Sequence, residues 1–298
     1  MKKRILIQLD CDPQPSTFDA VVAVDAGAEV LLRHGGVTPD TVVPLVHGAM
    51  FTRGGADLAS TAIFVGGSDV KAAEAVYEKV RKTFFGPVRV GVMLDPSGAN
   101  TTASAAVVAA ARHLPLGDPQ AAARCHAVVL GGTGPVGQRV ARLLARKGIA
   151  VTVASRSLDR AAEVCERISK QLGSVRLEAV STADLAAAGN ACRAAIERAD
   201  LIVAAGAAGV TLLDAAGRAV ARNAKVLIDL NAVPPAGIEG IAATDKARAD
   251  GGAVVYGPLG VGGTKMKIHR AGIQRLFESN DAALDAEELL AIGEAGQA

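Results

Sequence analysis

The chain has 298 residues, a length typical of two domains, and half of its residues are hydrophobic. The formal net charge is +2 and no long run of Lys or Arg occurs, which argues against nucleic acid or a membrane surface as a partner. Six Phe, two Tyr and no Trp supply few rings for the base stacking that single-stranded nucleic-acid binding uses.

The first 120 residues alternate predicted strands and helices. We expect strands at 4–10, 28–32, 61–65 and 88–94, and helices at 18–26, 38–46 and 70–82. A polar loop at 95–102 opens a helix of small residues that runs to about residue 112. This alternation is typical of a layered α/β domain, and residues 114–123, with Pro and Gly, form the predicted linker to a second domain.

The second domain begins with a strand, a glycine turn, a helix and a second strand, between His126 and Arg156. Three glycines match the G-x-G-x-x-G spacing, in which the first makes the turn, the second admits a pyrophosphate and the third lets helix pack on strand. The helix N-terminus offers N–H groups to the phosphates. We therefore predict a dinucleotide site formed by Gly132, Thr133, Gly134, Pro135, Val136 and Gly137.

The end of the second strand of this unit selects the dinucleotide. An NAD site usually carries an acidic residue here, whereas this chain has Ala154, Ser155, Arg156 and Ser157. The guanidinium of Arg156 suits a phosphate, and the two serines add hydroxyl donors. We predict NADP as the cofactor, with NAD as a weaker substitute. The alternative is that Arg156 is a solvated strand end and that specificity is mixed.

The rest of the chain continues the alternation. Helices are predicted at 158–172, 182–198, 264–278 and 285–292, strands at 175–180, 200–206, 224–230 and 254–256, and a flexible glycine turn at 257–263. In an open α/β sheet the ligand lies beyond the carboxyl ends of the strands. We therefore add to the cofactor site Ala205 and Gly206, which lack bulk, and Asn231, which can bind a carboxamide.

The four cysteines show no C-x-x-C spacing and no histidine placed for zinc, so no metal site is expected. Free thiols in a chain of this size are typical of a reducing cytoplasm. The basic N-terminus precedes an apolar stretch too short for a signal peptide, and no run reaches transmembrane length. We expect a cytoplasmic protein.

Several segments together resemble the NADP-dependent methylene-tetrahydromethanopterin / methylene-tetrahydrofolate dehydrogenases of methylotrophic bacteria. The resemblance spans nearly the whole chain, and its N-terminal motifs are the specific ones. The segments that carry it are QLDCDPQPSTFD (8–19), FTRGG (51–55), TAIFVGG (61–67), FFGP (84–87), the glycine turn (131–137), NAVPP (231–235), KMKIHR (265–270) and LFES (276–279).

The resemblance implies oxidation of the one-carbon bridge between N5 and N10 of a reduced pterin, by direct hydride transfer to C4 of NADP⁺, without metal or flavin. It also implies homo-oligomers, trimers or hexamers. We expect an N-terminal α/β pterin-binding domain at 1–120, completed by 270–298. A Rossmann-type doubly wound parallel sheet at 121–269 is expected to bind NADP. Because the ring nitrogens stabilise the cation, a cleft that holds two rings face to face is expected rather than a catalytic triad.

The resemblance also names candidate catalytic residues. Phe18, at a predicted helix start, is a candidate to bind the substrate. Asp19, beside it, is a candidate to bind the pterin or favour its nascent cation, although an acid there also suits the helix dipole. Lys265 is a candidate donor to a pterin carbonyl, with a solvated lysine as the alternative. Lys267 points about 200° away on a helix. We interpret His269, one turn beyond Lys265, as structural.

A loop-to-helix junction supplies the other substrate candidates, Ser97, Asn100, Thr101 and Thr102, which cap the helix, contact the pterin, or do both. Two other functions stay open. One is a different two-domain NADP oxidoreductase, such as a shikimate-dehydrogenase-like enzyme, and the other is a non-catalytic NADP-sensing protein.

Overall fold

The computed structural model describes residues 2–183 and 190–296, and the chain divides into two compact units. Unit 1 comprises residues 1–101 and 266–298, and unit 2 comprises residues 102–265. The divisions fall within two helices, α4 (Ala99–Ala111) and α10 (Pro258–Arg275), whereas the sequence places them at 120/121 and 269/270. Residues 114–123 include a short helix, α5 (Pro119–Ala122), whose N-cap is Asp118.

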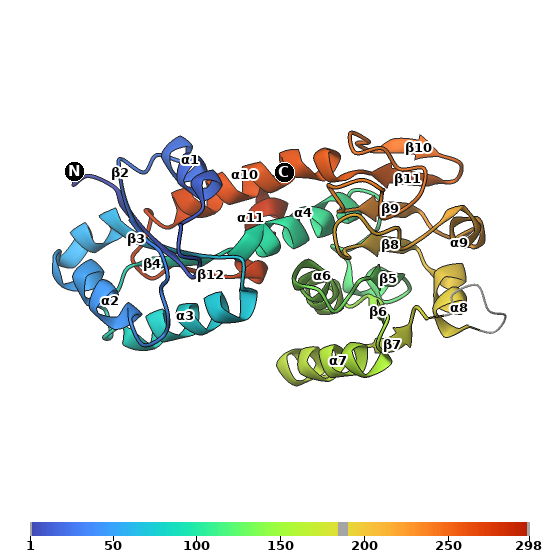
Figure 1. The fold of residues 1–298 in the computed structure, drawn as a ribbon, viewed down its shortest axis with the longest axis horizontal. Helices are drawn as coiled ribbons and strands as arrows, with labels where there is room; N and C mark the ends of the chain where they lie inside the picture. The colour runs from blue at the N-terminus through green and yellow to red at the C-terminus, as the bar shows by residue number, and fades with distance from the viewer. Residues whose placement is uncertain (1, 184–189, 297–298) are drawn as a thin grey trace. The chain divides into compact units, whose positions relative to one another are not determined.

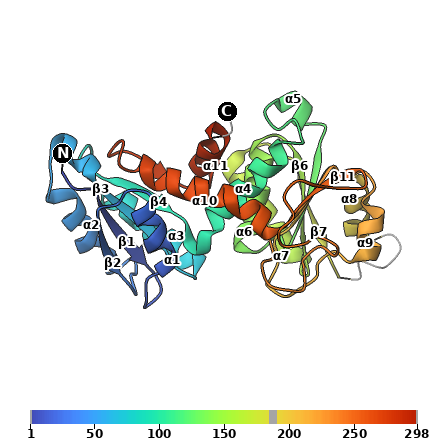
Figure 2. The ribbon, with the colours of Figure 1, turned by 90° about the horizontal axis from the view of Figure 1, so that it is seen from above.

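Unit 1 is built on a parallel sheet whose described strands follow the order β12-β4-β3-β1-β2. The strands are β1 (Ile5–Asp10), β2 (Val30–His34), β3 (Thr61–Gly66), β4 (Gly91–Leu94) and β12 (Ala283–Leu284). Figure 2 shows β2 beside β1 at the edge of this sheet. The helical segments are α1 (Thr17–Asp25), α2 (Val42–Phe51), η1 (Gly55–Ser60), α3 (Val70–Thr83), η2 (Pro96–Gly98) and α11 (Ala286–Ala295).

Helices cover both faces of the unit 1 sheet. Ile7 and Leu9 of β1 join a buried cluster with the apolar faces of α2 and α3, as the period of two in a strand requires. On the other face α10 approaches closely. A Cβ on Gly272 would lie 2.8 Å from Leu289 of α11 and 3.1 Å from the sulfur of Met93 in β4.

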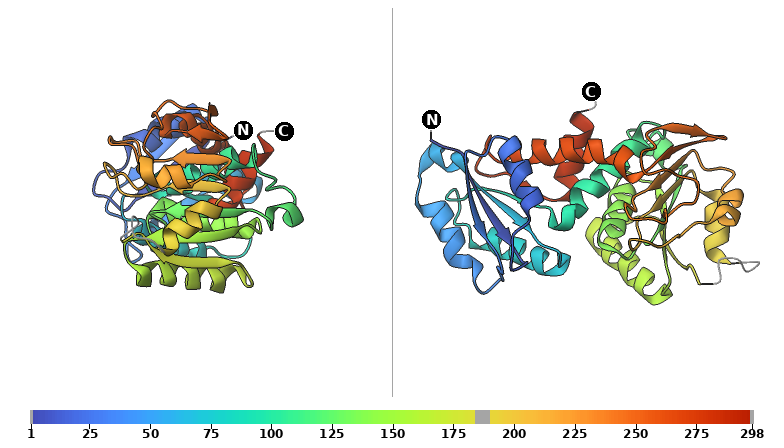
Figure 3. Two further views of the ribbon diagram at one scale, coloured as in Figure 1. Left: turned by 90° about the vertical axis from the view of Figure 1, so that its right-hand side faces the viewer. Right: turned by 45° about the horizontal axis from the view of Figure 1, so that its top comes forward.

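Unit 2 is a doubly wound sheet with the order β10-β11-β9-β8-β5-β6-β7 among the described strands. The strands are β5 (His126–Leu130), β6 (Ala150–Ser155), β7 (Leu177–Ser181), β8 (Leu201–Ala204), β9 (Val226–Asp229), β10 (Arg248–Asp250) and β11 (Ala253–Tyr256), and β10 alone of these is antiparallel. Helices α6 (Pro135–Arg146) and α7 (Leu158–Leu172) lie on one side, with α8 (Ala191–Arg198) and α9 (Ala215–Val220) on the other (Figures 1 and 3).

These two sheets confirm the predicted fold class, two α/β domains of which the second is Rossmann-like. Each sheet also has a point where the strand order reverses, between β1 and β3 in unit 1 and between β5 and β8 in unit 2. Ligands of open α/β sheets bind beyond the carboxyl ends of the strands at such points. The topology therefore predicts ligand sites beside Asp10 and Gly66 in unit 1, and beside Gly131 and Ala205 in unit 2.

The glycine-rich stretch 257–263 was predicted as a flexible turn, and this prediction is wrong. Helix α10 begins at Pro258 and includes most of that stretch. A Cβ on Gly257 would lie 2.0 Å from the carbonyl oxygen of Ala242, and one on Gly260 would lie 1.9 Å from that of Asp245. These glycines serve close packing of the helix on the 242–245 loop, not flexibility.

Other boundaries differ as well. The helix predicted at 38–46 begins at Val42, because Thr38 and Thr41 form a hydrogen-bonded turn before it, and it extends to Phe51. The short β10, β12 and α9 were not predicted. Part of the predicted helix 182–198 falls on residues 184–189, outside the described residues, and α8 is described from Ala191. None of the described helices combines the length and apolarity that crossing a bilayer requires.

Candidate functional site

The glycine turn of unit 2 joins β5 to α6 at the reversal of strand order. Gly131 has φ +71°, and a Cβ on it would lie 2.5 Å from the Cα of Gly206, so the turn touches the end of β8 backbone to backbone. Gly134 is the N-cap of α6 with no side-chain cap, and Pro135 occupies the first turn. This helix N-terminus is therefore formed by bare backbone, the arrangement that suits a phosphate.

The three glycines of the predicted motif differ in how closely the protein packs around them. A Cβ on Gly132 would lie 2.9 Å from the carbonyl oxygen of Val129, and one on Gly137 would lie 2.5 Å from that of Gly131. At Gly134 the nearest atoms would be 3.4 Å away, an ordinary contact, and φ is −76°. Packing within the protein thus explains Gly132 and Gly137, but it does not explain Gly134.

The predicted ribose-phosphate residues lie at the carboxyl end of β6, beside this turn. The hydroxyls of Thr133 and Ser155 are 3.2 Å apart, and Ser157 caps α7 by accepting from the N–H of Arg160. Arg156 is exposed, and its carbonyl accepts from the hydroxyl of Ser181. Ser155 is buried and Ser157 is half-buried, so Arg156 is the most accessible of these three residues.

Asn231 lies in a braced loop after β9. Its side-chain amide donates to the carbonyl oxygen of Pro235 at 3.0 Å, and its side-chain oxygen accepts from the N–H of Val233 at 3.1 Å. Asp229 supports the same loop by accepting from the N–H groups of Asn231, Gly237 and Ile238. Burial raises the pKa of the Asp229 carboxyl, although the backbone donors oppose that shift. The structure thus gives the Asn231 side chain a role within the loop; the carboxamide contact stays a prediction.

In unit 1 the reversal of strand order is lined by buried carboxylates. Asp10, fully buried at the end of β1, accepts from the N–H groups of Asp12 at 2.9 Å and Ser16 at 3.0 Å. A Cβ on Gly66, at the end of β3, would lie 3.4 Å from Oδ2 of Asp10 and 3.7 Å from Oδ2 of Asp19. The two carboxylates therefore flank the same glycine.

A third carboxylate and a histidine complete this group. His269 of α10 is fully buried, with Nε2 4.0 Å from Oδ1 of Asp19 and Nδ1 4.0 Å from Oδ2 of Asp95. Its ring stacks on Phe64 with centroids 5.6 Å apart and is tilted against Phe18 at 6.3 Å. We call Asp10, Asp19 and Asp95 the carboxylate cluster.

The predicted substrate residues divide by exposure. Asn100 and Thr101 are fully buried: Asn100 donates to the carbonyl oxygen of Leu94 and to Asp285, and Thr101 donates to Asp95 at 2.7 Å. Ser97 is exposed, with φ 52°, and donates to the carbonyl oxygen of Gly67. Thr102 is half-buried. Asn100 and Thr101 thus hold the start of α4 and orient Asp95.

Phe18 and Asp19 begin α1, whose N-cap Ser16 accepts from the N–H of Asp19. Phe18 is 52% exposed while Asp19 is 8% exposed, so the ring presents an apolar surface next to a nearly buried carboxylate. On α10, Lys265 is half-buried and Lys267 is exposed, as expected for opposite faces of a helix. Arg53, whose role the sequence left open, donates to the carbonyls of Lys3 and Ser60.

Sequence reasoning missed the setting of Asp10, Asp95 and His269. A usable signal existed for the two aspartates, because each directly ends a buried apolar strand. For His269 the signal was its position one turn beyond Lys265, without any hint of its partners. Within residues 2–183 and 190–296, no group of three or more His, Cys, Asp or Glu side chains forms a metal-holding set.

Comparison with known proteins identifies the family. Residues 17–97 match the N-terminal model of methylene-tetrahydromethanopterin dehydrogenase. The chain is 44% identical over 293 residues to the bifunctional protein MdtA of Methylorubrum extorquens, covering 97% of each chain. It is 32% identical over 284 residues to the NAD(P)-dependent methylenetetrahydromethanopterin dehydrogenase of the same bacterium, covering 94% of each. The chain belongs to the methylene-tetrahydromethanopterin dehydrogenase family.

Unit 2 also matches a second family model, and the whole chain resembles two solved structures. Residues 119–248 match the shikimate / quinate 5-dehydrogenase model. Quinate dehydrogenase of Corynebacterium glutamicum superposes with a TM-score of 0.52 at 17% identity, over 97% of this chain and 98% of that one. 5-Ketofructose reductase of a Gluconobacter species gives 0.51 at 12% identity, over 99% of each. These structures share the fold, whereas the match over 17–97 distinguishes the family.

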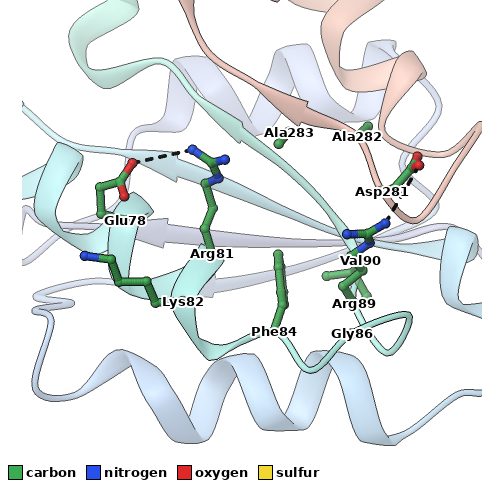
Figure 4. Close-up of a pocket in the computed structure, with 10 residues that line it drawn as sticks. All are labelled: Glu78, Arg81, Lys82, Phe84, Gly86, Arg89, Val90, Asp281, Ala282 and Ala283. Carbon is green, nitrogen blue, oxygen red and sulfur yellow. Dashed lines mark ion pairs between the residues drawn. The ribbon is translucent and has the colours of Figure 1, made fainter. Parts of the chain in front are cut away.

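Unit 1 also has a pocket of about 470 Å³ at the opposite, amino end of its sheet (Figure 4). Two ion pairs stand on its rim, Arg81 with Glu78 at 3.5 Å and Arg89 with Asp281 at 3.9 Å. Because ligands of parallel sheets lie at the carboxyl ends, we assign this pocket no part in the family's chemistry. Its lining is Glu78, Arg81, Lys82, Phe84, Gly86, Arg89, Val90, Asp281, Ala282 and Ala283.

Proposed function

We propose that the protein oxidises the methylene bridge of a methylene-tetrahydropterin to the methenyl form by reversible, direct hydride transfer to NADP⁺. The observation that carries this proposal is the 44% identity to MdtA over 97% of both chains. The N-terminal family match, residues 17–97, contains Asp19 and Asp95 of the carboxylate cluster. The proposed substrate is methylene-tetrahydromethanopterin, methylene-tetrahydrofolate or both.

The reaction is balanced without an acid or a base. The bridge carbon loses a hydride to C4 of the nicotinamide, which becomes NADPH, and lone pairs of N5 and N10 stabilise the resulting methenyl cation. The protein must therefore hold donor and acceptor carbons about 3–3.5 Å apart and exclude water. In this proposal, the buried carboxylates of unit 1 favour the developing positive charge.

In unit 2, we propose that the pyrophosphate lies at the bare N-terminus of α6. Gly134 supports this, because packing within the protein gives no reason for glycine there. Thr133, Pro135 and Val136 complete the turn, with Ala205 and Gly206 beside it. Arg156 would bind the ribose phosphate and give the preference for NADP over NAD, with Ser155 and Ser157 at the same strand end.

The roles of the predicted catalytic and pterin-binding residues belong to the same proposal. Lys265 donates to the pterin, Asp19 binds it or favours its cation, and Phe18 supplies an apolar surface for the ring. Ser97 and Thr102 are the candidates among the loop hydroxyls that burial leaves accessible. We further propose a homo-oligomer, trimer or hexamer, in a reducing cytoplasm, which the free Cys11, Cys125, Cys165 and Cys192 suit.

The test is an activity grid of two pterins against two coenzymes. NADPH and methenyl absorbance are expected to rise together with at least one methylene-tetrahydropterin, and more slowly with NAD⁺. Turnover of a hydroxy acid without turnover of either pterin would favour the shikimate-dehydrogenase-like alternative. Tight NADP binding with no hydride transfer to NADP⁺ from either pterin or the hydroxy acid would favour the sensing protein.

A further inference from the structure

The buried histidine of unit 1 stands among groups that favour a positive charge. Asp95 accepts three hydrogen bonds, from the N–H of Asn100 at 2.9 Å, the N–H of Thr101 at 3.0 Å and the hydroxyl of Thr101 at 2.7 Å. Asp10 accepts two from backbone N–H groups. These donors hold both carboxyl groups in place, and one of them, Asp95, faces His269.

Each ring nitrogen of His269 faces a different carboxylate. Nδ1 is 4.0 Å from Asp95 and Nε2 is 4.0 Å from Asp19, and all three side chains are at least 90% buried. A neutral imidazole has one N–H, so it would present a lone pair to one of the two carboxylates. An imidazolium has an N–H on both sides, and buried charges are retained where opposite charges accompany them.

The ring is held in this orientation by aromatic packing. Phe64 of β3 stacks on it at 5.6 Å with an interplanar angle of 16°, and Phe18 of α1 covers it at 6.3 Å and 40°. An aromatic face stabilises a cation placed over it. The histidine thus reaches Asp19 with a fixed ring plane, and Oδ2 of Asp19 remains directed toward Gly66.

We propose that His269 is an imidazolium that positions Asp19 and keeps it ionised for the proposed pterin reaction. This inference rests on the proposed function for its effect on turnover, but not for the charge itself. His269 acts through Asp19 and is a positioning residue. Asp95 faces the other ring nitrogen, and Lys265 lies one turn earlier on α10. Asp10 lies beside the same glycine as Asp19, and Asp285 accepts from Asn100, whose N–H donates to Asp95.

Nitrogen-15 NMR of histidine-labelled, full-length protein tests the charge directly. At about pH 7.5, one unit above the ordinary histidine value, His269 is expected to show two protonated ring nitrogens. Burial lowers the pKa of His113 and of His126, so those rings are expected to be neutral at that pH. The His269→Gln variant assigns the signal; if it does not fold, Gln variants of the other four histidines assign it by elimination.

Kinetics test the positioning role. His269→Gln is expected to lower kcat/KM for the pterin by about tenfold or more, with the dissociation constant for NADPH unchanged. In the pH profile of kcat/KM for the pterin, the low-pH limb of this variant should lie at higher pH than that of the unmodified protein. The reason is that removal of a neighbouring cation makes the Asp19 carboxylate easier to protonate. His47→Gln, an exposed histidine on α2, is the matched control and should change neither.

The two failures can be told apart. A neutral imidazole at that pH, or an acid limb that does not move in His269→Gln, overturns the role of His269 even if pterin turnover is strong. Absence of pterin turnover overturns the proposed function, while the NMR result still decides the charge of His269.

Discussion

The glycine turn of unit 2 makes a prediction that separates folding from cofactor binding. Gly137→Ala places a Cβ 2.5 Å from a carbonyl oxygen and 2.8 Å from a Cα, both in the backbone of Gly131 and Gly132. Relief requires the turn to move, so the change is expected to cost about 1–3 kcal/mol. For a unit of this size, that lowers Tm by roughly 2–12 °C.

Gly134→Ala is the partner in this comparison. Its Cβ would meet no atom of the described protein closer than 3.4 Å, and its φ of −76° is ordinary for alanine. Loss of stability should stay below about 1 kcal/mol, the usual range for a helix N-cap change of this kind. If a pyrophosphate lies against Gly134, however, NADPH affinity should fall at least about tenfold, or 1.4 kcal/mol.

Thermal unfolding of the unliganded protein and titration calorimetry with NADPH measure the two effects. The expected pattern is a lower Tm for Gly137→Ala and a weaker NADPH affinity at nearly unchanged Tm for Gly134→Ala. If Gly134→Ala binds NADPH as the unmodified protein does, the pyrophosphate does not lie where we propose, and the turn is a structural one.

The other predictions concern the coenzyme, the pterin and pH. Arg156→Ala should raise KM for NADP⁺ about tenfold or more, because a charge-assisted hydrogen bond is lost, and should raise KM for NAD⁺ much less. An equal rise in KM for both coenzymes would mean that Arg156 is structural. Lys265→Ala should lower kcat about 10–100-fold, whereas Lys267→Ala should have a mild effect. The reverse order would mean that Lys267, not Lys265, faces the pterin. Burial raises the pKa of the Cys192 thiol from 9.0 to about 11. The protonated thiol therefore stabilises the fold fully below about pH 9, and that contribution is lost as pH rises through about 11; Tm should decline over that range, and less steeply in Cys192→Ala.

The sequence predicted what local patterns determine. Apolar runs and the glycine spacing located the sheets and the turn, because period and turn chemistry are local. The prediction of a flexible turn at 257–263 was wrong, because glycine occurs both in flexible segments and where backbones pack closely. The carbonyls of Ala242 and Asp245, which show that these glycines serve close packing, lie beside them only in the folded chain.

The carboxylate cluster shows the same limit at the site. Asp19 was singled out from resemblance, but its contact with His269 joins residues far apart in the chain, and no local pattern encodes it. Thr101 was predicted as a cap or a pterin contact, and the structure shows it buried and bound to Asp95. Burial is a property of the whole unit, so a polar loop-to-helix junction alone could not distinguish these roles.

The central claim is that hydride passes directly from the pterin bridge to NADP⁺, and isotope transfer tests it most directly. With a pterin whose methylene carbon carries two deuterium atoms, each turnover should place one deuterium at C4 of the reduced nicotinamide and release none to water. Reduced coenzyme without deuterium, formed while the labelled pterin is oxidised, would contradict direct transfer.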